Sequence, residues 1–387
     1  MSELSRAARY TQALVRCASV TPAEGGALSL IEGWLKPYGF EIDRPVFQTP
    51  GSYAVENLYA RLGSGEPCLV FAGHTDVVPT GDEARWTHPP FSGAVFEGEI
   101  WGRGAQDMKA GVAASIAAVL DHLDTHGAPK GGSIAFLITG DEEADAYDGT
   151  VKLLEWAKAR GEVFSACVLG EPTNPDVMGE MMKIGRRGSM TCWFTATGVQ
   201  GHSAYPHRAK NPMSALVRLL ARLEEKPLDE GTAHFDASTL AITTIDCGNP
   251  ATNVIPARGA ATVNIRFNDL HSGASLSEWL SAHAAAVQAE TGVQIDCRFQ
   301  ISGESFLTPP GELSELIASA VQAETGRRPE PSTSGGTSDA RFVKAHCPVV
   351  EFGLVGKTMH QVDERVEVAQ IGQLKAIYAR ILRDYFA

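Results

Sequence analysis

Four apolar runs constrain the fold of this chain more than any other feature of its sequence. They are Leu69–Ala72, Ser133–Thr139, Phe164–Leu169 and Pro348–Gly353, and none shows the regular polar alternation of a strand with one exposed face. Continuous apolar strands are typical of parallel sheets that helices cover on both faces. The runs therefore predict an α/β fold around a mixed, largely parallel sheet.

Each run leads into a loop that carries a histidine or an acidic residue. In chain order these side chains are His74 and Asp76, Glu142 and Glu143, Glu171, and His360. Ligands of open α/β sheets bind beyond the carboxyl ends of the strands, so we expect these side chains to lie at one edge of the sheet. Taken singly, each is an ordinary solvated loop residue, but together they predict a shared site.

Asp107 stands at the start of a small-residue helix predicted over residues 108–123. The Ala and Gly content of this helix suits close packing on a sheet. Asp is favoured at helix N-caps, so capping is the alternative to a ligand role for Asp107.

Length and charge limit the classes of protein that this chain can belong to. With 387 residues it is long enough for two domains. A net charge of −13 argues against nucleic acid or an anionic membrane as a partner. The seven cysteines include no C-x-x-C pair, and neither a signal pattern nor an apolar run of transmembrane length occurs. We therefore expect a cytoplasmic protein with reduced thiols.

Residues 187–300 differ from the rest of the chain in the order of their predicted helices and strands. They alternate as strand, helix, strand, strand, helix and strand, which is the ferredoxin-like order. We therefore expect an inserted α+β domain over 187–300, and a discontinuous α/β domain over 1–186 and 301–387.

The predicted site contains two imidazoles and three carboxylates from His74, Asp107, Glu171, His360 and one of the paired glutamates. This N/O donor set suits zinc or cobalt rather than calcium. Two histidines with a shareable carboxylate favour a two-metal site that activates water. Of Glu142 and Glu143, one can bind metal while the other takes up the proton of the water; their spacing does not say which. Asp76, two residues after His74, is placed to orient its imidazole.

The chain resembles the metallopeptidase family M20. The motifs that carry the resemblance span nearly the whole chain: His74-Thr-Asp76, Gly102-Arg-Gly-Ala-Gln-Asp107-Met-Lys, Asp141-Glu142-Glu143, Gly170-Glu171-Pro172 and the late His360. The resemblance implies a zinc-peptidase-like catalytic domain with an inserted lid and dimerisation domain. It also implies two Zn²⁺ per subunit, with Co²⁺ able to substitute, and a homodimer formed through the lid.

The same resemblance assigns roles to individual residues. It implies that His74 and Glu171 hold one zinc and Glu143 and His360 the other, with Asp107 bridging. Glu142 would be the general base, and Asp76 would orient His74. It further implies that His202 reaches the active site of the partner subunit and helps to form an oxyanion hole. The positions that match substrate contacts are Arg186, Ser189, Tyr205, Asn253, Arg266, Gly336 and Thr337.

Within the family, the motifs match best those members that hydrolyse the amide bond of N-succinyl-LL-2,6-diaminopimelate. Arginines bind carboxylates in a bidentate manner, so Arg186 and Arg266 suit such a substrate. A related deacylase, such as an acetylornithine deacetylase, or a zinc carboxypeptidase is the nearest alternative. A non-catalytic binding paralogue is the alternative from a different class, although an intact ligand set argues against it.

Overall fold

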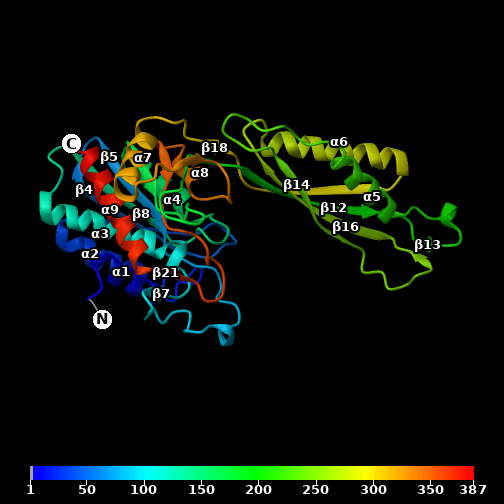
Figure 1. Ribbon diagram of the computed structural model, residues 1–387. Helices are drawn as coiled ribbons and strands as arrows, with labels where there is room; N and C mark the ends of the chain where they lie inside the picture. Colours follow the sequence, from blue (N-terminus) through cyan, green and yellow to red (C-terminus); the bar gives the residue numbers. More distant parts are fainter. Residues whose placement is uncertain (1–2) are drawn as a thin grey trace. The chain divides into compact units, whose positions relative to one another are not determined.

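The computed structural model describes residues 3–387, which form two compact units (Figure 1). The first unit comprises the chain up to Ile184 together with Thr308–Ser332 and Ser338–Ala387. The second comprises Gly185–Leu307 and Thr333–Thr337. The boundaries lie a few residues from the predicted 186/187 and 300/301, and the short segment 333–337 belongs to the second unit.

The first unit is built on a mixed sheet, which has eight strands within the described residues. In spatial order they are β1 (Glu41–Asp43), β4 (Leu58–Ser64), β8 (Gly132–Thr139), β5 (Cys68–His74), β9 (Ala166–Leu169), β20 (Val349–Glu351), β10 (Met181–Lys183) and β19 (Glu330–Ser332). Strands β8, β5, β9 and β20 run parallel to one another, whereas β4 and β10 are antiparallel to β8 and β20. This confirms the predicted mixed, largely parallel sheet.

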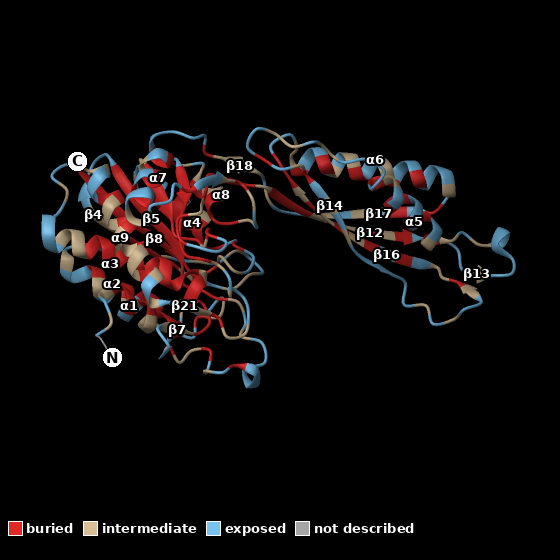
Figure 2. Ribbon diagram, viewed as in Figure 1, coloured by how far each residue is buried: buried red, intermediate tan, exposed pale blue. Residues whose placement is uncertain are grey.

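The four apolar runs are the four parallel strands at the centre of this sheet. Every residue of β5, β8, β9 and β20 is buried, as Figure 2 shows for β5 and β8. Because both faces are covered, these strands have no position for a solvated side chain, which explains the lack of polar alternation.

Helices cover the sheet closely. Helix α3 (Ala110–His126) packs against β5, α1 (Arg6–Val15) and α9 (Val368–Tyr385), while α4 (Thr150–Ala159) packs on β8. At Gly111 of α3, a Cβ atom would lie 2.4 Å from the carbonyl oxygen of Gly170. Only glycine fits this contact. The start of α3 therefore lies directly against the turn after β9. The predicted close packing of the small-residue helix is therefore present.

Shorter elements complete the first unit. They are α2 (Ala27–Leu35), α7 (Glu312–Thr325), α8 (Ala340–Val343), β2 (Val46–Phe47), β3 (Val55–Glu56), β6 (Ala94–Phe96), β7 (Glu99–Trp101), β21 (Arg365–Glu367) and the helical turns Lys36–Tyr38, Glu83–Arg85 and Ala105–Lys109. Within residues 3–387, no helix is both long and apolar enough to cross a membrane.

The second unit has the predicted ferredoxin-like order. Along the chain its main elements are β12 (Gly188–Thr197), α5 (Pro212–Leu223), β14 (Thr239–Asp246), β16 (Arg258–Phe267), α6 (Gly273–Thr291) and β17 (Gln294–Gly303). The strands form an antiparallel sheet in the order β14-β16-β12-β17. Phe194, Leu220, Val263 and Leu280 belong to the core between this sheet and the two helices. The smaller elements are β11 (Gly185–Arg186), β13 (Gly201–His202), β15 (Val254–Ile255), β18 (Phe306–Leu307) and the turn Pro206–Arg208.

Candidate metal centre

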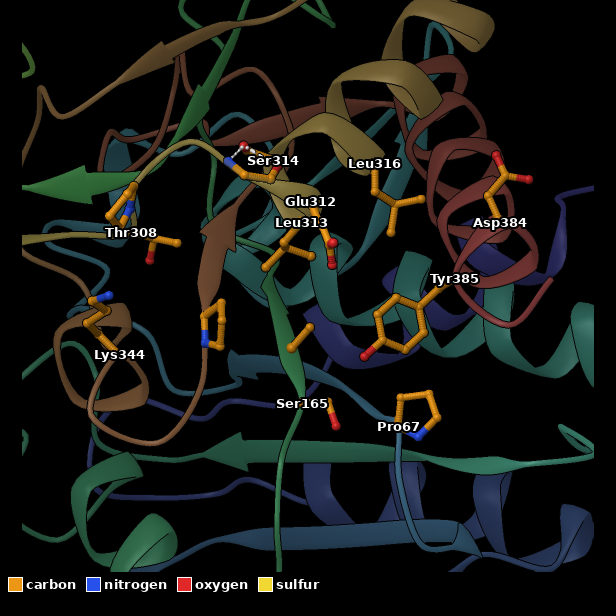
Figure 3. Close-up of a pocket in the computed structure, with 14 residues that line it drawn as sticks. Pro67, Ser165, Thr308, Glu312, Leu313, Ser314, Leu316, Lys344, Asp384 and Tyr385 are labelled. Carbon is orange, nitrogen blue, oxygen red and sulfur yellow. Dashed lines mark hydrogen bonds between the residues drawn. The ribbon is translucent and has the colours of Figure 1, made fainter.

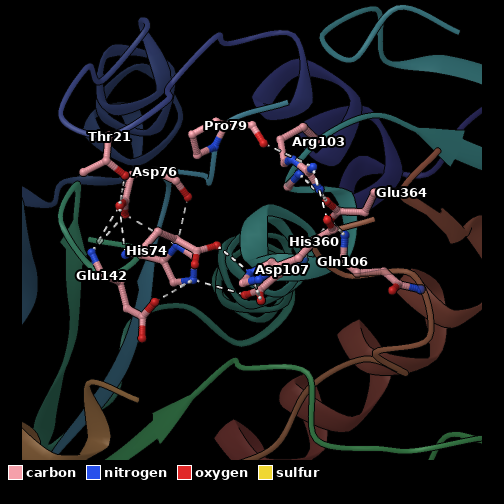
Figure 4. A network of polar contacts seen from close by, with 12 residues as sticks. Thr21, His74, Asp76, Pro79, Arg103, Gln106, Asp107, Glu142, His360 and Glu364 are labelled. Carbon is pink, nitrogen blue, oxygen red and sulfur yellow. Dashed lines mark hydrogen bonds and ion pairs between the residues drawn. The ribbon is translucent and has the colours of Figure 1, made fainter. Parts of the chain in front are cut away.

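Side chains from the carboxyl ends of the parallel strands meet those from the turn before α3 (Figure 4). They form two overlapping triads: His74, Asp107 and Glu171, and Asp107, Glu143 and His360. Within each triad, one nitrogen or oxygen atom of every residue lies within 4.8 Å of those of the other two. The structure thus brings together the five side chains that the sequence predicts as ligands.

Asp107 lies at the centre of the arrangement. Its Oδ1 is 3.2 Å from Nε2 of His74, and its Oδ2 is 3.2 Å from Nε2 of His360. Burial alone would raise the pKa of this carboxyl, but hydrogen bonds to His360 and His74 lower it overall. Asp107 does not cap α3, because Lys109 is the N-cap of this helix. Both carboxylate oxygens are therefore available to ligands on either side.

His74 is the last residue of β5 and is almost completely buried. Its Nδ1 lies 3.0 Å from the main-chain oxygen of Asp76 and 3.5 Å from the carboxylate of the same residue. The nearer partner is thus the carbonyl group, although the sequence predicts the carboxylate. Since both are acceptors, Nδ1 carries the proton. Nε2 then faces the carboxylates of Asp107 and Glu171, the latter at 3.7 Å.

The carboxylate of Asp76 also holds the loop after β8. It accepts the backbone N–H groups of Glu142, at 3.2 Å, and Glu143, at 3.1 Å. The hydroxyl of Thr21 donates to it at 2.7 Å. The buried carboxylate of Asp76 therefore fixes the backbone position of both glutamates.

Glu143 and Glu142 point to different partners. Oε1 of Glu143 is 3.1 Å from Nε2 of His360, whereas Oε2 of Glu142 is 3.9 Å from Nε2 of His74. Hydrogen bonds with Asp107 and Glu143 raise the pKa of His360 to about 10. The geometry therefore places Glu143 within a triad and leaves Glu142 beside it.

The charges of the centre suit divalent cations. Burial raises the pKa of Glu171 well above its usual range, and the nearby charge of Asp107 adds to this effect. Carboxylates crowded in this way, with two imidazole Nε2 atoms among them, form the mixed nitrogen and oxygen donor set that zinc and cobalt prefer. Because Asp107 is shared, the residues fit two neighbouring cations.

Sequence reasoning missed a buried carboxylate beside the centre. Asp339, at the start of α8, is 3% exposed, and burial raises its pKa to about 6. Burial is also the main cause of the raised pKa of Glu142, and the charge of Asp339 adds to it. Asp339 directly follows the stretch that contains Gly336 and Thr337, but only its place in the fold brings it near Glu142.

The predicted substrate contacts lie in the second unit, in two groups. One group is at the start of β12. Nη1 of Arg186 donates to the carbonyl oxygen of Gly336 at 3.2 Å, next to Thr337. Ser189 on β12 is the cross-strand partner of Arg266 on β16, and both Ser189 and Arg186 are buried.

The other group lies beyond the opposite end of β12. His202 on β13 pairs with β15, and the N–H of Ser203 donates to the carbonyl oxygen of Asn253. The ring of Tyr205 lies 5.8 Å from that of His202. Since the ten residues of β12 separate the two groups, they are roughly 30 Å apart along the strand.

A separate pocket of about 690 Å³ lies in the first unit (Figure 3). Its lining includes Pro67, just before β5, and Ser165, just before β9, together with Lys344 and Tyr385. It is therefore at the amino ends of the strands that carry the triads at their carboxyl ends, and it is not part of the metal centre.

The comparison with protein families matches residues 70–384 to the peptidase family M20/M25/M40. The chain belongs to this family, as its motifs and the fold of its first unit indicate.

Curated relatives match the chain over nearly its whole length. A Cereibacter sphaeroides protein named succinyl-diaminopimelate desuccinylase is 66% identical, over 97% of this chain and 98% of the relative. Succinyl-diaminopimelate desuccinylase 1 of a Ruegeria species is 62% identical over 98% of both chains. A Methylorubrum extorquens protein with the first of these names is 59% identical over 97% of both.

Solved structures confirm the fold class. An M20 family metallo-carboxypeptidase from Sulfolobus solfataricus superposes with a TM-score of 0.78 at 16% identity, over 99% of this chain and all of that one. A Staphylococcus aureus tripeptidase gives a TM-score of 0.77 at 17% identity, with 99% of both chains covered. A dinuclear metal-binding M20 peptidase from Bacillus subtilis gives 0.69 at 16% identity, with 98% of both covered.

Proposed function

We propose that this protein hydrolyses the amide bond of N-succinyl-LL-2,6-diaminopimelate to succinate and LL-2,6-diaminopimelate, a step toward diaminopimelate and lysine. The 66% identity to a named succinyl-diaminopimelate desuccinylase over 97% of the chain is the observation that carries this substrate. The two triads that share Asp107 support the hydrolytic chemistry.

Two Zn²⁺ ions per subunit are the proposed cofactors, and Co²⁺ is the proposed substitute. His74 and Glu171 would hold one ion and Glu143 and His360 the other, with Asp107 common to both. When bound, such ions lower the pKa of water toward neutrality and polarise a carbonyl group.

Glu142 is the proposed general base. Its carboxylate is close to both triads without being a member of either, and its raised pKa suits a group that must take up and release a proton. It would accept a proton from the attacking water and deliver it to the leaving nitrogen. Asp76 would keep Nδ1 of His74 protonated and hold the loop from which Glu142 projects.

The second unit is the proposed lid. Arg186, Ser189, Arg266, Gly336 and Thr337 form one group of proposed substrate contacts, and Arg186 and Arg266 suit the carboxylates of the substrate. Tyr205 and Asn253 belong with His202 in the other group. Because the ten residues of β12 separate His202 from the first group, we propose that the partner subunit's His202 reaches the site. Its N–H would stabilise the oxyanion there. The N–H of Ala204 donates to Nδ1 of His202, so in the neutral ring Nε2 carries the proton.

A homodimer formed through the second unit is part of the proposal. Strand β14 is at the edge of the sheet, where main-chain groups can pair with another strand. Half of the Ile245 side chain on β14 and more than half of Val217 on α5 are exposed.

We place the protein in the cytoplasm because its seven cysteines are all free. The proposal includes no nucleic-acid or membrane partner, in line with the charge of −13.

A substrate panel tests this function against the nearest alternatives. The purified protein would be given N-succinyl-LL-2,6-diaminopimelate, N-acetylornithine and a dipeptide, and kcat/KM would be measured for each. We expect the succinylated substrate to be preferred by at least about 100-fold, since the others lack the succinyl carboxylate that an arginine of the site would bind. Preference for N-acetylornithine or the dipeptide would assign the chain to a related M20 activity.

A further inference from the structure

A buried ion pair outside the two triads braces the turn that carries Asp107 (Figure 4). The carboxylate of Glu364 is fully buried and lies 2.8 Å from Nη1 of Arg103. The same carboxylate accepts the backbone N–H groups of Gly104 at 3.0 Å, Gln106 at 2.9 Å and Asp107 at 3.2 Å. A single side chain therefore accepts three backbone N–H groups of this turn, while those of Ala105 and Lys109 donate to backbone carbonyl groups.

The guanidinium of Arg103 also binds the backbone of the loop that carries His360. Its Nη1 donates to the carbonyl oxygen of Gln361 at 3.1 Å, and its Nη2 to that of His360 at 3.4 Å. Nη2 also donates to the carbonyl oxygen of Pro79, in the loop after β5, at 3.3 Å. The backbone of His360 is in the left-handed region, with φ of 62°. A residue with a side chain keeps this conformation only where its surroundings impose it, and the guanidinium is one such contact.

We propose that Glu364 and Arg103 are positioning residues that set the cation affinity of the triad formed by Asp107, Glu143 and His360. The inference rests on the proposed metal centre. Glu364 is not itself a ligand candidate, because its oxygens are occupied by backbone N–H groups and by Arg103. The pair acts instead by holding Oδ2 of Asp107 and Nε2 of His360 at their distance of 3.2 Å.

The other triad depends less on this pair. His74 is hydrogen-bonded into the sheet as the last residue of β5, and Glu171 comes two residues after the end of β9. Both are thus positioned by the parallel strands, and only Asp107 of that triad is braced by Glu364. Loss of the ion pair should therefore weaken one cation site more than the other.

The test is a Zn²⁺ titration of the metal-free protein in competition with a chromophoric chelator. The wild type should bind two ions per subunit. In Glu364→Gln the side chain keeps its shape, but its NH₂ group meets the backbone N–H donors. We expect one of the two Zn²⁺ affinities to fall by about 10- to 100-fold, as for other residues that orient metal ligands, while the other changes by less than about 3-fold.

A matched pair elsewhere in the first unit provides the control. Arg61 and Glu162 form a largely buried ion pair, and Arg61 also binds Ser133 near the start of β8, at the opposite edge of the sheet. Glu162→Gln should lower the Tm but leave both Zn²⁺ affinities unchanged. If Glu364→Gln does not fold, Arg103→Lys decides, since lysine keeps the charge but not the forked contacts.

The outcomes separate the inference from the function on which it rests. A folded Glu364→Gln or Arg103→Lys variant with both Zn²⁺ affinities of the wild type overturns the positioning role. An equal loss in Glu162→Gln also overturns it, because the effect would then be one of general stability. A wild type that binds no Zn²⁺ contradicts the proposed metal centre itself.

Discussion

Both carboxylate oxygens of Asp76 lie 3.2 Å from the backbone nitrogen of Glu142. One of these oxygens is also 3.5 Å from Nδ1 of His74. A single buried carboxylate therefore connects the proposed base, in the loop after β8, to a proposed ligand at the end of β5.

Replacing Asp76 by Asn should disturb both partners, because an amide can offer only one acceptor oxygen and places an NH₂ group against N–H donors. We expect kcat/KM to fall by about 10- to 100-fold, together with weaker Zn²⁺ binding, measured by steady-state kinetics and metal titration. Thr21→Val, which removes only the 2.7 Å hydrogen bond to Asp76, should have a smaller effect. Wild-type kinetics in Asp76→Asn would rule out this connecting role.

Glu142→Gln should separate metal binding from turnover. The amide cannot accept a proton from water, so kcat should fall by about 10²- to 10⁴-fold, while two Zn²⁺ per subunit remain bound. Glu143→Gln is the matched control, since its side chain is part of a triad, and it should lose metal as well as activity. A near-normal kcat in Glu142→Gln would remove Glu142 from the role of base.

Hybrid dimers test whether His202 acts in the partner subunit. His202→Ala and Glu142→Gln should each have little activity alone. In a random equimolar mixture, half of the dimers are hybrids, and each hybrid contains one site with both residues intact if His202 crosses to the partner. Activity should then recover to about one quarter of the wild type. If His202 serves its own subunit, mixing the variants restores nothing.

Asp229 should contribute stability to the second unit in a pH-dependent manner. Burial opposes its charge, but hydrogen bonds from Ser238, Gly231 and Asn268 lower its pKa to about 2. Because this pKa is below the ordinary value of about 3.9, the stabilisation is present above pH 4 and is lost as the pH falls toward 2. Allowing for solvent screening, Asp229→Asn should cost about 1 kcal/mol at pH 6 and less at pH 3.

Urea unfolding of the wild type and Asp229→Asn at the two pH values measures this difference. The hydrogen bond between Asp229 and His271, at 3.1 Å, is absent from a His271→Ala variant, which serves as a second probe of the same cluster. An equal stability gap at pH 6 and pH 3 would contradict the assigned cause.

The sequence predicts the parts of this molecule whose signal is local. Runs buried on both faces identify β5, β8, β9 and β20, and the residues that follow them identify the candidate ligands, because strand ends and loop chemistry are adjacent in the chain. The sequence does not predict β1, β10 and β19, which have three residues each, or β4, whose seven residues are fully buried only at the first three positions. Such strands are only partly buried, so their side chains lack a continuous apolar pattern.

The sequence does not reveal two buried acidic residues at the site, because contacts between distant segments of the chain bury them. Glu364 resembles a solvated acidic residue in its sequence context, yet it is fully buried against backbone N–H groups from the turn before Asp107. Asp339 likewise has no local pattern that places it near Glu142. Burial of a charge depends on partners that only the folded chain supplies, so neither residue could be assigned from its neighbours in sequence.

The most direct test of the central claim is turnover of N-succinyl-LL-2,6-diaminopimelate before and after chelation. The metal-loaded protein should release succinate, the chelated protein should lose nearly all activity, and added Zn²⁺ or Co²⁺ should restore it. Unchanged succinate release from protein shown to be free of metal would contradict the account, as would no release from protein shown to hold two ions per subunit.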